Sequence, residues 1–187
     1  MAQTSQDAPY IARHVALRAG IPIPVPAYSV NRLCGSGFQA IVNAAQAILT
    51  DEAGVILAAG AESMSQAPYV ARGARWGIRL GASELEDYLW SALTDKYTGL
   101  SMAVSTEKLA KEKGVSRIAA DEYAYRSQMA YAKAREKGYF KEEIIPIELS
   151  DHKGQKILFE NDEHPKPQTT LEGLSKLKAY FVEGGAV

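Results

Sequence analysis

A chain of 187 residues has room for one or two domains, and its 47% hydrophobic and 23% charged residues are typical of a globular protein. The formal net charge of −1 excludes the basic footprint of a nucleic-acid-binding or membrane-surface protein. A single cysteine, Cys34, excludes an internal disulfide and favours a reducing compartment. Residues 1–10 show no secretory signal, and the longest apolar run, residues 55–59, is too short to cross a bilayer. We therefore expect a soluble cytoplasmic protein, with mitochondrial and peroxisomal locations left open.

The first third of the chain predicts a βαβ unit. Asp7 is expected to cap a helix that ends at Gly20. Residues 27–33 then predict a strand, residues 38–49 a helix that is apolar almost all round, and residues 54–60 a second strand. Such a helix is buried, and strands joined in this way lie parallel in a sheet that is covered on both faces. A chain of this length can bury roughly 70% of its unfolded surface, so we expect a core. Two strands cannot form a doubly covered sheet, so we also expect this first domain to be incomplete.

Beyond residue 60 the sequence predicts a second, differently built region. Glycine and arginine recur between residues 72 and 81, which indicates an irregular loop. The elements expected after it are a helix over 102–113 ended by Gly114, a helix capped by Ser116 and ended by Gly138, a hairpin of strands 144–149 and 155–159, and a short helix opened by a capping box of Thr169 and Glu172.

The chemistry is expected where the first predicted strand gives way to the apolar helix. Only a thiolate is a strong nucleophile, and the dipole and unpaired N–H groups at the N-terminus of a buried helix would stabilise the thiolate of Cys34. Gly35 and Gly37 are expected to let the backbone turn sharply and to leave room for a substrate. A lone cysteine is more often a small buried hydrophobe, so a structural cysteine in an α/β domain remains the alternative.

Residues 31–38, with the sequence Asn-Arg-Leu-Cys-Gly-Ser-Gly-Phe, resemble the nucleophile motif of the thiolases, which cleave or form 3-oxoacyl-CoA thioesters. Three further segments, residues 60–65, 101–110 and 162–171, are similar to thiolase segments in the same order. The resemblance covers essentially the whole chain and is slightly closer to the degradative 3-ketoacyl-CoA type. It implies an α/β fold, with an incomplete thiolase-type core over residues 1–64 that carries Cys34, and an α+β loop domain over residues 65–187 on the coenzyme side.

The same resemblance implies coenzyme A or acyl-CoA as substrate, with no tightly bound cofactor and no metal. Met102 would lie along the pantetheine, and Ser101 stands where some relatives have a histidine. Lys166 stands where many relatives have an arginine near the nucleotide end, and its phosphate contact should be looser because lysine lacks the bidentate fork. Core packing for Met102 and a solvated charge for Lys166 are the alternatives. Thiolases are usually dimers or tetramers, which implies a homo-oligomer; the loop arginines Arg72, Arg75 and Arg79 are interpreted as surface or subunit contacts.

Three groups that thiolases also use are absent from this sequence: the histidine of a Gly-His-Pro segment, the asparagine of an Asn-Glu-Ala-Phe segment and a second cysteine. His14, His152 and His164 stand in none of those contexts. The histidine activates the nucleophile and the second cysteine moves a proton, so we expect the isolated chain to be inactive or nearly so. Two other interpretations stay open, a ketoacyl-synthase-like condensing enzyme and a thiolase-like protein that binds CoA or lipid without catalysis.

Overall fold

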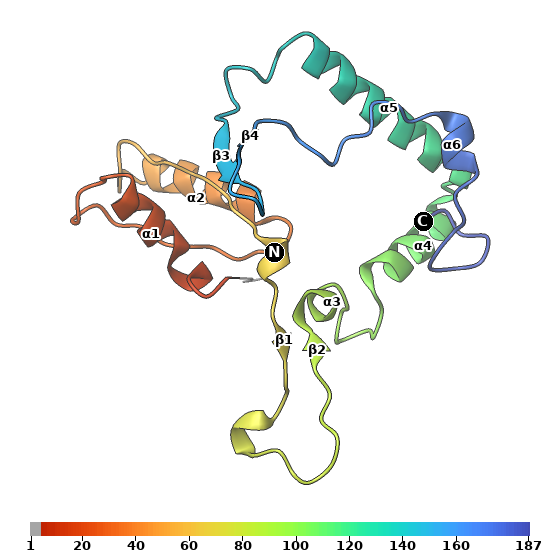
Figure 1. Cartoon of the computed structure of the whole chain (residues 1–187), viewed down its shortest axis with the longest axis horizontal. Coiled ribbons are helices and arrows are strands. Elements are labelled where there is room, and N and C mark those ends of the chain that lie inside the picture. Colours follow the sequence, from red (N-terminus) through yellow and green to blue (C-terminus); the bar gives the residue numbers. More distant parts are fainter. Residues whose placement is uncertain (1–4) are drawn as a thin grey trace. The chain divides into compact units, whose positions relative to one another are not determined.

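A computed structural model describes residues 5–187, which contain both helices and strands (Figure 1). In chain order the elements are 3₁₀ turn η1 (Ala8–Tyr10), helices α1 (Ile11–Arg18) and α2 (Ser36–Leu49), turn η2 (Met64–Gln66), strand β1 (Tyr69–Val70), turn η3 (Ala74–Trp76), strand β2 (Glu86–Asp87), helices α3 (Tyr88–Ala92), α4 (Met102–Lys113) and α5 (Arg117–Glu136), strands β3 (Ile147–Ser150) and β4 (Lys156–Phe159), and helix α6 (Leu171–Ser175). They form two compact units, Met1–Ser101 and Met102–Val187. The domain boundary expected between residues 64 and 65, with a thiolase-type core before it and a loop domain after it, stays a prediction.

Helix α1 ends as the sequence predicts but begins differently. Gly20 follows it at a φ of 78°, the left-handed conformation in which glycine commonly ends helices. Asp7 makes no side-chain cap bond. Its carboxylate instead accepts a hydrogen bond from Ser5 Oγ at 2.9 Å and lies 3.5 Å from His14 Nδ1. The prediction of an Asp7 cap is therefore wrong, because the carboxylate of Asp7 contacts the side chains of Ser5 and His14 instead of the backbone N–H groups at the helix start.

The two strands expected in the first unit do not form among residues 5–187. Residues 26–31 and 55–63 have no regular secondary structure and join no ladder. The sheets of the described chain are the antiparallel pairs β1–β2 and β3–β4. The expected parallel pair is absent because a strand is held by hydrogen bonds to a neighbouring strand, and no described strand pairs with either segment.

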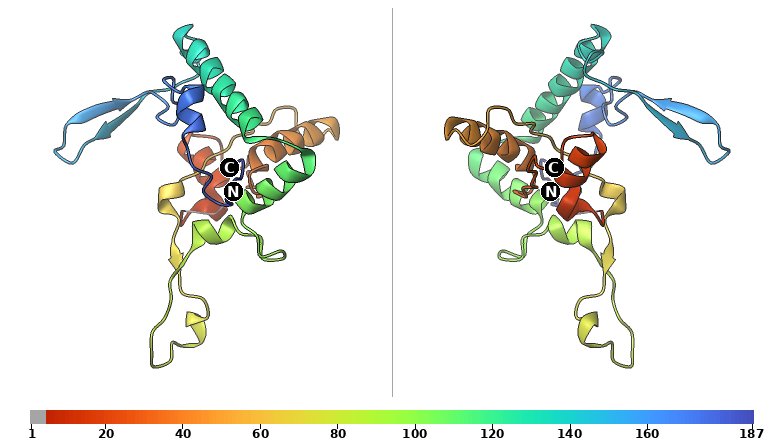
Figure 2. Two further views of the ribbon diagram at one scale, coloured as in Figure 1. Left: turned by 90° about the vertical axis from the view of Figure 1, so that its right-hand side faces the viewer. Right: turned by 90° about the vertical axis from the view of Figure 1, so that its left-hand side faces the viewer.

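Strands β1 and β2 form the base of an arm, defined here as residues 69–87, that projects from the first unit (Figures 1 and 2). Val70 pairs with Glu86 at this base, and Arg72 Nε donates a hydrogen bond to Glu86 Oε2 at 3.0 Å. Asp87 then caps α3 by accepting a hydrogen bond from the backbone N–H of Leu89 at 2.9 Å. The predicted irregular loop is thus present, but its two ends are paired.

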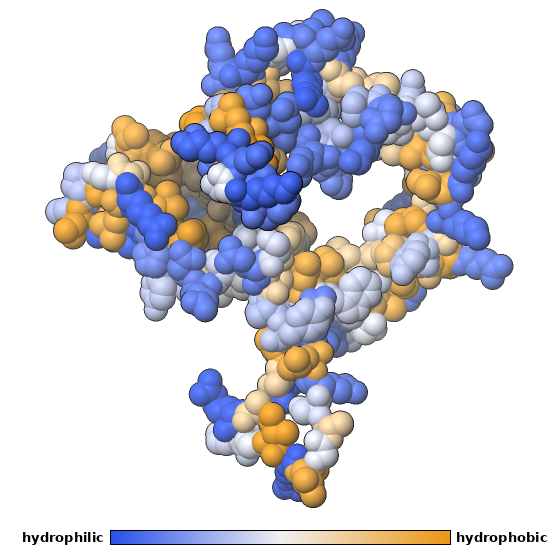
Figure 3. Space-filling view, viewed as in Figure 1, coloured by the Kyte–Doolittle hydropathy of each residue, from blue (hydrophilic) through white to orange (hydrophobic). Residues whose placement is uncertain are grey.

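The expected core is missing from the described residues. Among residues 5–187, Ala16 is the only buried hydrophobic residue, and helix α2, expected to be buried, contains no buried residue. Figure 3 shows the resulting apolar surface on the arm and around α1 and α2. Helix α2 is apolar on most sides, yet each of its residues is half-buried or exposed in the described chain.

The helices of the second unit have the predicted limits. Gly114 and Gly138 follow α4 and α5 with φ values of 66° and 73°. Ser116 Oγ accepts a hydrogen bond from the backbone N–H of Ala119 at 3.1 Å, which confirms the predicted N-cap of α5. These boundaries follow from capping groups that lie within a few residues of each helix end.

The hairpin strands are shorter than predicted, and the last helix is shifted by one residue from its prediction. Strand β3 begins at Ile147 rather than residue 144, and Ile147 pairs with Phe159 of β4. In Figure 2 this hairpin stands away from α5. Thr170, rather than Thr169, caps α6 by accepting a hydrogen bond from the backbone N–H of Gly173 at 3.0 Å. The predicted capping box is therefore wrong by one residue.

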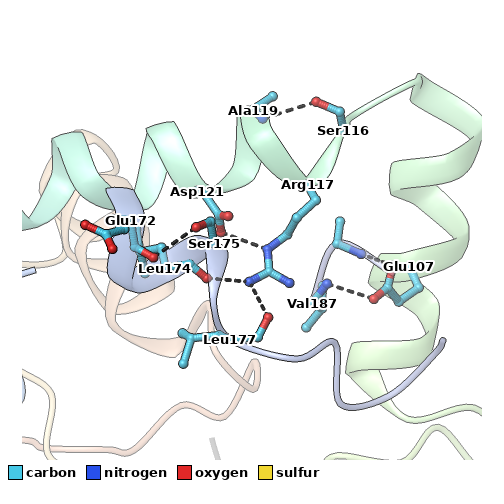
Figure 4. Close-up of polar contacts among 11 residues, drawn as sticks. Glu107, Ser116, Arg117, Ala119, Asp121, Glu172, Leu174, Ser175, Leu177 and Val187 are labelled. Atoms are coloured by element: carbon cyan, nitrogen blue, oxygen red, sulfur yellow. Dashed lines mark hydrogen bonds and ion pairs between the residues drawn. The ribbon is translucent and has the colours of Figure 1, made fainter. Parts of the chain in front are cut away.

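Arg117 joins α6 to the start of α5 (Figure 4). Its guanidinium donates hydrogen bonds to Asp121 Oδ1 at 2.9 Å and to the backbone oxygens of Leu174 at 2.8 Å and Leu177 at 3.0 Å. Because arginine carries several donors in a fixed fork, this one side chain binds the carbonyl of Leu174 in α6 and that of Leu177 just after the helix.

Glu107 joins α4 to the last residues of the chain (Figure 4). Its two carboxylate oxygens accept hydrogen bonds from the backbone N–H groups of Ala186 at 2.9 Å and Val187 at 2.8 Å. Glu107 is also the one buried charged residue in the described chain. A carboxylate is tolerated there because it is paired with N–H donors, so this unit is held together by polar contacts where apolar burial is slight.

Candidate active site

Cys34 lies at the entrance to α2. It is exposed and immediately precedes Gly35, the N-cap residue of the helix. Helix α2 thus begins at Ser36, two residues after Cys34 and two residues before the predicted start at Phe38. The backbone N–H groups of Gly35 and Ser36 donate hydrogen bonds to the backbone oxygens of Arg32 at 3.1 Å and Leu33 at 3.0 Å, which closes a tight turn around the cysteine. The position suits a nucleophile, and the catalytic role of Cys34 stays a prediction.

The sharp turn before Cys34 is made by Leu33 rather than by glycine. Leu33 has a φ of 51°, a left-handed conformation that costs a non-glycine residue about 1–2 kcal/mol. Gly35 has an ordinary φ of −85°, and a Cβ added to Gly37 would meet no atom within 4 Å. The expectation that the two glycines provide the turn is therefore wrong. Strained residues of this kind are concentrated at functional sites.

Two polar side chains hold this turn. Asn31 Oδ1 accepts a hydrogen bond from the backbone N–H of Leu33 at 3.0 Å. Ser36 Oγ accepts one from the backbone N–H of Arg32 at 2.8 Å and donates one to the backbone oxygen of Leu33 at 2.7 Å. Each such bond contributes about 0.5–1.5 kcal/mol, so the three together can offset the strain at Leu33. Sequence reasoning named this segment but missed these roles, although asparagine and serine are typical of side-chain-stabilised turns.

Arg32 extends the network along α2. Its guanidinium donates a hydrogen bond to Gln39 Oε1 at 2.8 Å, and Gln39 Nε2 donates one to Asn43 Oδ1 at 2.7 Å. Gln39 and Asn43 are two of the few polar residues of this helix. The polar stripe of α2 thus fixes the side chain that stands two residues before Cys34.

We expect Ser36→Ala to slow the alkylation of Cys34 by iodoacetamide at least about threefold, because the turn loses two hydrogen bonds worth about 1–2 kcal/mol and the sulfur is held less firmly at the helix end. The rate is measured by intact mass against time. Ser127→Ala, a change at an exposed position of α5, is the matched control and should leave the rate unchanged. Equal rates for both variants would contradict this role of Ser36.

The residues expected on the coenzyme side lie at the start of α4 and in the loop before α6. Ser101 forms an isolated bridge with Thr94, and Met102 is the first residue of α4. Met102 is 56% exposed, so it is not core filler in the described chain. Lys166 Nζ donates a hydrogen bond to the backbone oxygen of Glu163 at 3.1 Å. Its backbone N–H donates to Gln128 of α5, which fixes the loop on that helix.

A separate, open pocket of about 300 Å³ lies at the C-terminal end of α5. Arg135 donates a hydrogen bond to Asn161 Oδ1 at 2.6 Å, and Tyr131 donates one to Asp162 Oδ2 at 3.1 Å. Partial desolvation, followed by the contact with Asp162, raises the pKa of Tyr131. Two pairs of polar groups in this pocket are thus hydrogen-bonded to each other, and none of the expected site residues lines it.

Residues 5–187 contain neither a metal-binding cluster nor a helix suited to a bilayer. No three histidine, cysteine, aspartate or glutamate side chains in this part of the chain gather as a metal site. Within the same residues, no helix combines the length and apolarity needed to cross a membrane.

Comparison with known proteins places the whole chain, residues 1–187, in the family described as the thiolase N-terminal domain. The chain is 50% identical over 186 residues to the mitochondrial 3-ketoacyl-CoA thiolase of Homo sapiens, a match that covers 99% of this chain and 47% of that protein. It superposes on the crystal structure of human mitochondrial 3-ketoacyl-CoA thiolase with a TM-score of 0.93, covering 100% of this chain and 47% of the other. With the complex of that thiolase with CoA the TM-score is 0.91 at 46% coverage of the other chain.

The chain combines helices and strands, and its TM-scores of 0.93 and 0.91 are with thiolase structures, which define an α/β fold. The chain belongs to the thiolase family, and its fold is a partial thiolase fold. It spans about half the length of the relatives that it matches.

Proposed function

We propose that this chain is the nucleophile-bearing part of a thiolase and that Cys34 takes up an acyl group as a thioester. The supporting observation is the exposed position of Cys34 on a side-chain-stabilised turn directly before α2. In thiolytic cleavage, the thiolate attacks the 3-oxo carbon of the substrate and the bond between C2 and C3 breaks. The C2 carbanion gains a proton and leaves as acetyl-CoA. The thiol of a second coenzyme A then displaces the acyl group from Cys34 and restores the thiolate.

The coenzyme side is proposed at Ser101, Met102 and Lys166. The exposed thioether of Met102 is available to an apolar pantetheine arm. The Lys166 ammonium uses one of its three donors on Glu163, which leaves donors for a phosphate. The relative solved in complex with CoA supports coenzyme A as the ligand class. We propose CoA and acyl-CoA as exchanging substrates, with no tightly bound cofactor.

Proton transfer is proposed to depend on groups outside these 187 residues, namely a histidine that activates Cys34 and a second cysteine. The isolated chain should therefore turn over little or no substrate. A reducing compartment suits the mechanism because the thiol must stay free. The cytoplasm and the mitochondrion, named for the human relative, both provide one.

The proposal is tested by capturing the acyl-enzyme. The chain, combined with a polypeptide that supplies the rest of the fold, is incubated with acetyl-CoA and digested. We expect the mass of one acetyl group on the peptide that contains Cys34, and loss of that mass when free coenzyme A is added. Saturable binding of CoA without any acyl adduct would instead support a thiolase-like binding protein that lacks catalysis.

A homo-oligomer is proposed for the complete enzyme, with the arm as a contact. Its loop carries large apolar side chains that no described residue covers, Trp76 being 89% exposed, together with Ile78 and Leu80. Apolar residues gathered on a projecting segment are typical of protein interfaces. Light scattering should show that Trp76→Ser and Leu80→Ser lower the mass of the assembled enzyme.

The base of the arm should weaken in acid. The hydrogen bond from Arg72, followed by one from Ser91, lowers the pKa of Glu86 from 4.5 to about 2. Because the pKa is lower in the folded chain, the ionised carboxylate stabilises the base above pH 4.5, and this contribution is lost as the pH falls towards 2. Carboxyl NMR should give a Glu86 midpoint near 2, and Arg72→Gln should raise it towards 4.5. Arg75→Gln is the control, and an equal change with both variants would contradict the pairing.

A further inference from the structure

We propose that one face of α5, formed by Gln128, Tyr131 and Arg135, positions Lys166 for its contact with coenzyme A. The three side chains act by holding residues 161–166, the loop that carries Lys166, and they do not themselves contact the coenzyme. This inference rests on the proposed function, since it concerns the lysine assigned above to a phosphate.

Two side-chain hydrogen bonds fix the start of the loop on α5. Arg135 donates to Asn161 Oδ1 at 2.6 Å, and the Tyr131 hydroxyl donates to Asp162 Oδ2 at 3.1 Å. The second acceptor is a carboxylate, and hydrogen bonds to charged groups are about twice as strong as neutral ones. The ring of Tyr131 is also stacked on that of Phe140, with the centroids 5.4 Å apart, which fixes the direction of its hydroxyl.

A third hydrogen bond fixes the end of the loop. Gln128 Oε1 accepts it from the backbone N–H of Lys166 at 2.8 Å. Gln128, Tyr131 and Arg135 follow one another at intervals of three and four residues, so they share one face of the helix. The loop residues meet this face in reverse order, which ties the loop to α5 at both of its ends.

The chain around Lys166 is stiff. Pro165 and Pro167 flank the lysine, and proline fixes its own φ and restricts the residue before it. The carbonyl oxygen of Lys166 accepts hydrogen bonds from the Thr169 backbone N–H at 3.0 Å and from its hydroxyl at 2.6 Å. The ammonium donates to the backbone oxygen of Glu163 at 3.1 Å. A displacement of the loop on α5 therefore moves the ammonium with it.

This placement matters for binding because lysine is a point charge. It has no planar fork to align it with a phosphate, so its contribution depends on where the loop holds it. The contacts that hold the second unit together lie elsewhere, since Arg117 joins α6 to α5 and Glu107 joins α4 to residues 186 and 187. A change on the loop face of α5 should thus weaken coenzyme binding and leave those contacts intact.

The test compares variants of the assembled enzyme by two measurements, the dissociation constant for coenzyme A by calorimetry and kcat by steady-state kinetics. Tyr131→Phe keeps the stacked ring and removes the hydroxyl. We expect it to raise the dissociation constant about fivefold and to leave kcat within about twofold, because Cys34 lies outside the second unit. Tyr123→Phe, which removes an exposed hydroxyl from the same helix, is the matched control and should change neither quantity.

Conservative variants of the acceptor separate positioning from a general loss of structure. Asp162→Asn keeps an oxygen that can accept the hydrogen bond from Tyr131, so it should weaken coenzyme binding less than Asp162→Ala. Amide exchange at Lys166, whose N–H donates to Gln128, should accelerate at least about tenfold in Tyr131→Phe.

The role of Lys166 is measured in the same way. Lys166→Ala should raise the dissociation constant; if it does not, the proposed coenzyme contact and this inference both fail. A raised constant in Lys166→Ala with an unchanged one in Tyr131→Phe would overturn this inference alone. So would a kcat that falls as far as binding weakens. The expected shifts in an enzyme that forms no acyl adduct would contradict the proposed catalysis and leave this inference standing.

Discussion

Replacing Cys34 with alanine is expected to lower the kcat of the assembled thiolase at least about 1,000-fold, because the acyl group then has no sulfur on which to form a thioester. The measurement is the rate of acetyl-CoA release from acetoacetyl-CoA and coenzyme A. The KM for coenzyme A should change little, because the proposed coenzyme residues are untouched.

The controls for this prediction separate chemistry from folding. Ser127→Ala should keep full activity, since this serine is exposed on α5. Cys34→Ser should be nearly as inactive as Cys34→Ala, because a hydroxyl is far less ionised than a thiol at neutral pH. Retention of more than about a tenth of the activity in Cys34→Ala would refute the assigned role.

Adding a single methyl group at Gly185 is expected to open the contact between α4 and the last residues of the chain. A Cβ placed there would lie 2.1 Å from Glu107 Oε1 and 2.6 Å from its carboxyl carbon. Glu107 is buried, so its carboxylate cannot move away without losing the hydrogen bonds to Ala186 and Val187. Overpacking and the lost hydrogen bonds together should cost about 2–4 kcal/mol. The measurement is amide exchange at residues 186 and 187, which should accelerate at least about 30-fold.

Two variants of Glu107 should raise amide exchange at residues 186 and 187 to different extents. Glu107→Gln keeps one carbonyl acceptor, so exchange at residues 186 and 187 should rise less than in Glu107→Ala, which removes both acceptors. Glu112→Ala and Gly60→Ala are the controls, since Glu112 is exposed on α4 and a Cβ at Gly60 meets no atom within 4 Å. Equal exchange in Glu107→Ala and Glu112→Ala would show that the buried carboxylate does not hold this segment.

The helices of the second unit were predictable from sequence because their signals are local. Gly114 ends α4, and Ser116 and Gly138 bound α5, through groups only a few residues from each helix end. The strands expected over 27–33 and 54–60 were not, because strand pairing requires neighbours that the described chain does not contain.

The candidate site was predictable in part. The place of Cys34 before an apolar helix could be inferred from the sequence, but the left-handed Leu33 could not, because leucine rarely adopts that conformation. The role of Glu107 was missed because a glutamate within a helix normally faces solvent and its partners lie 79 and 80 residues away.

The exposed segment at residues 55–59 also affects how the 187-residue polypeptide behaves when it is produced alone. A run without charge or proline, exposed along both edges, can template cross-β aggregation and attract holdase chaperones and proteases. We therefore expect the 187-residue polypeptide, when it is produced alone, to aggregate through this run before it does so through the charged helices α4 and α5.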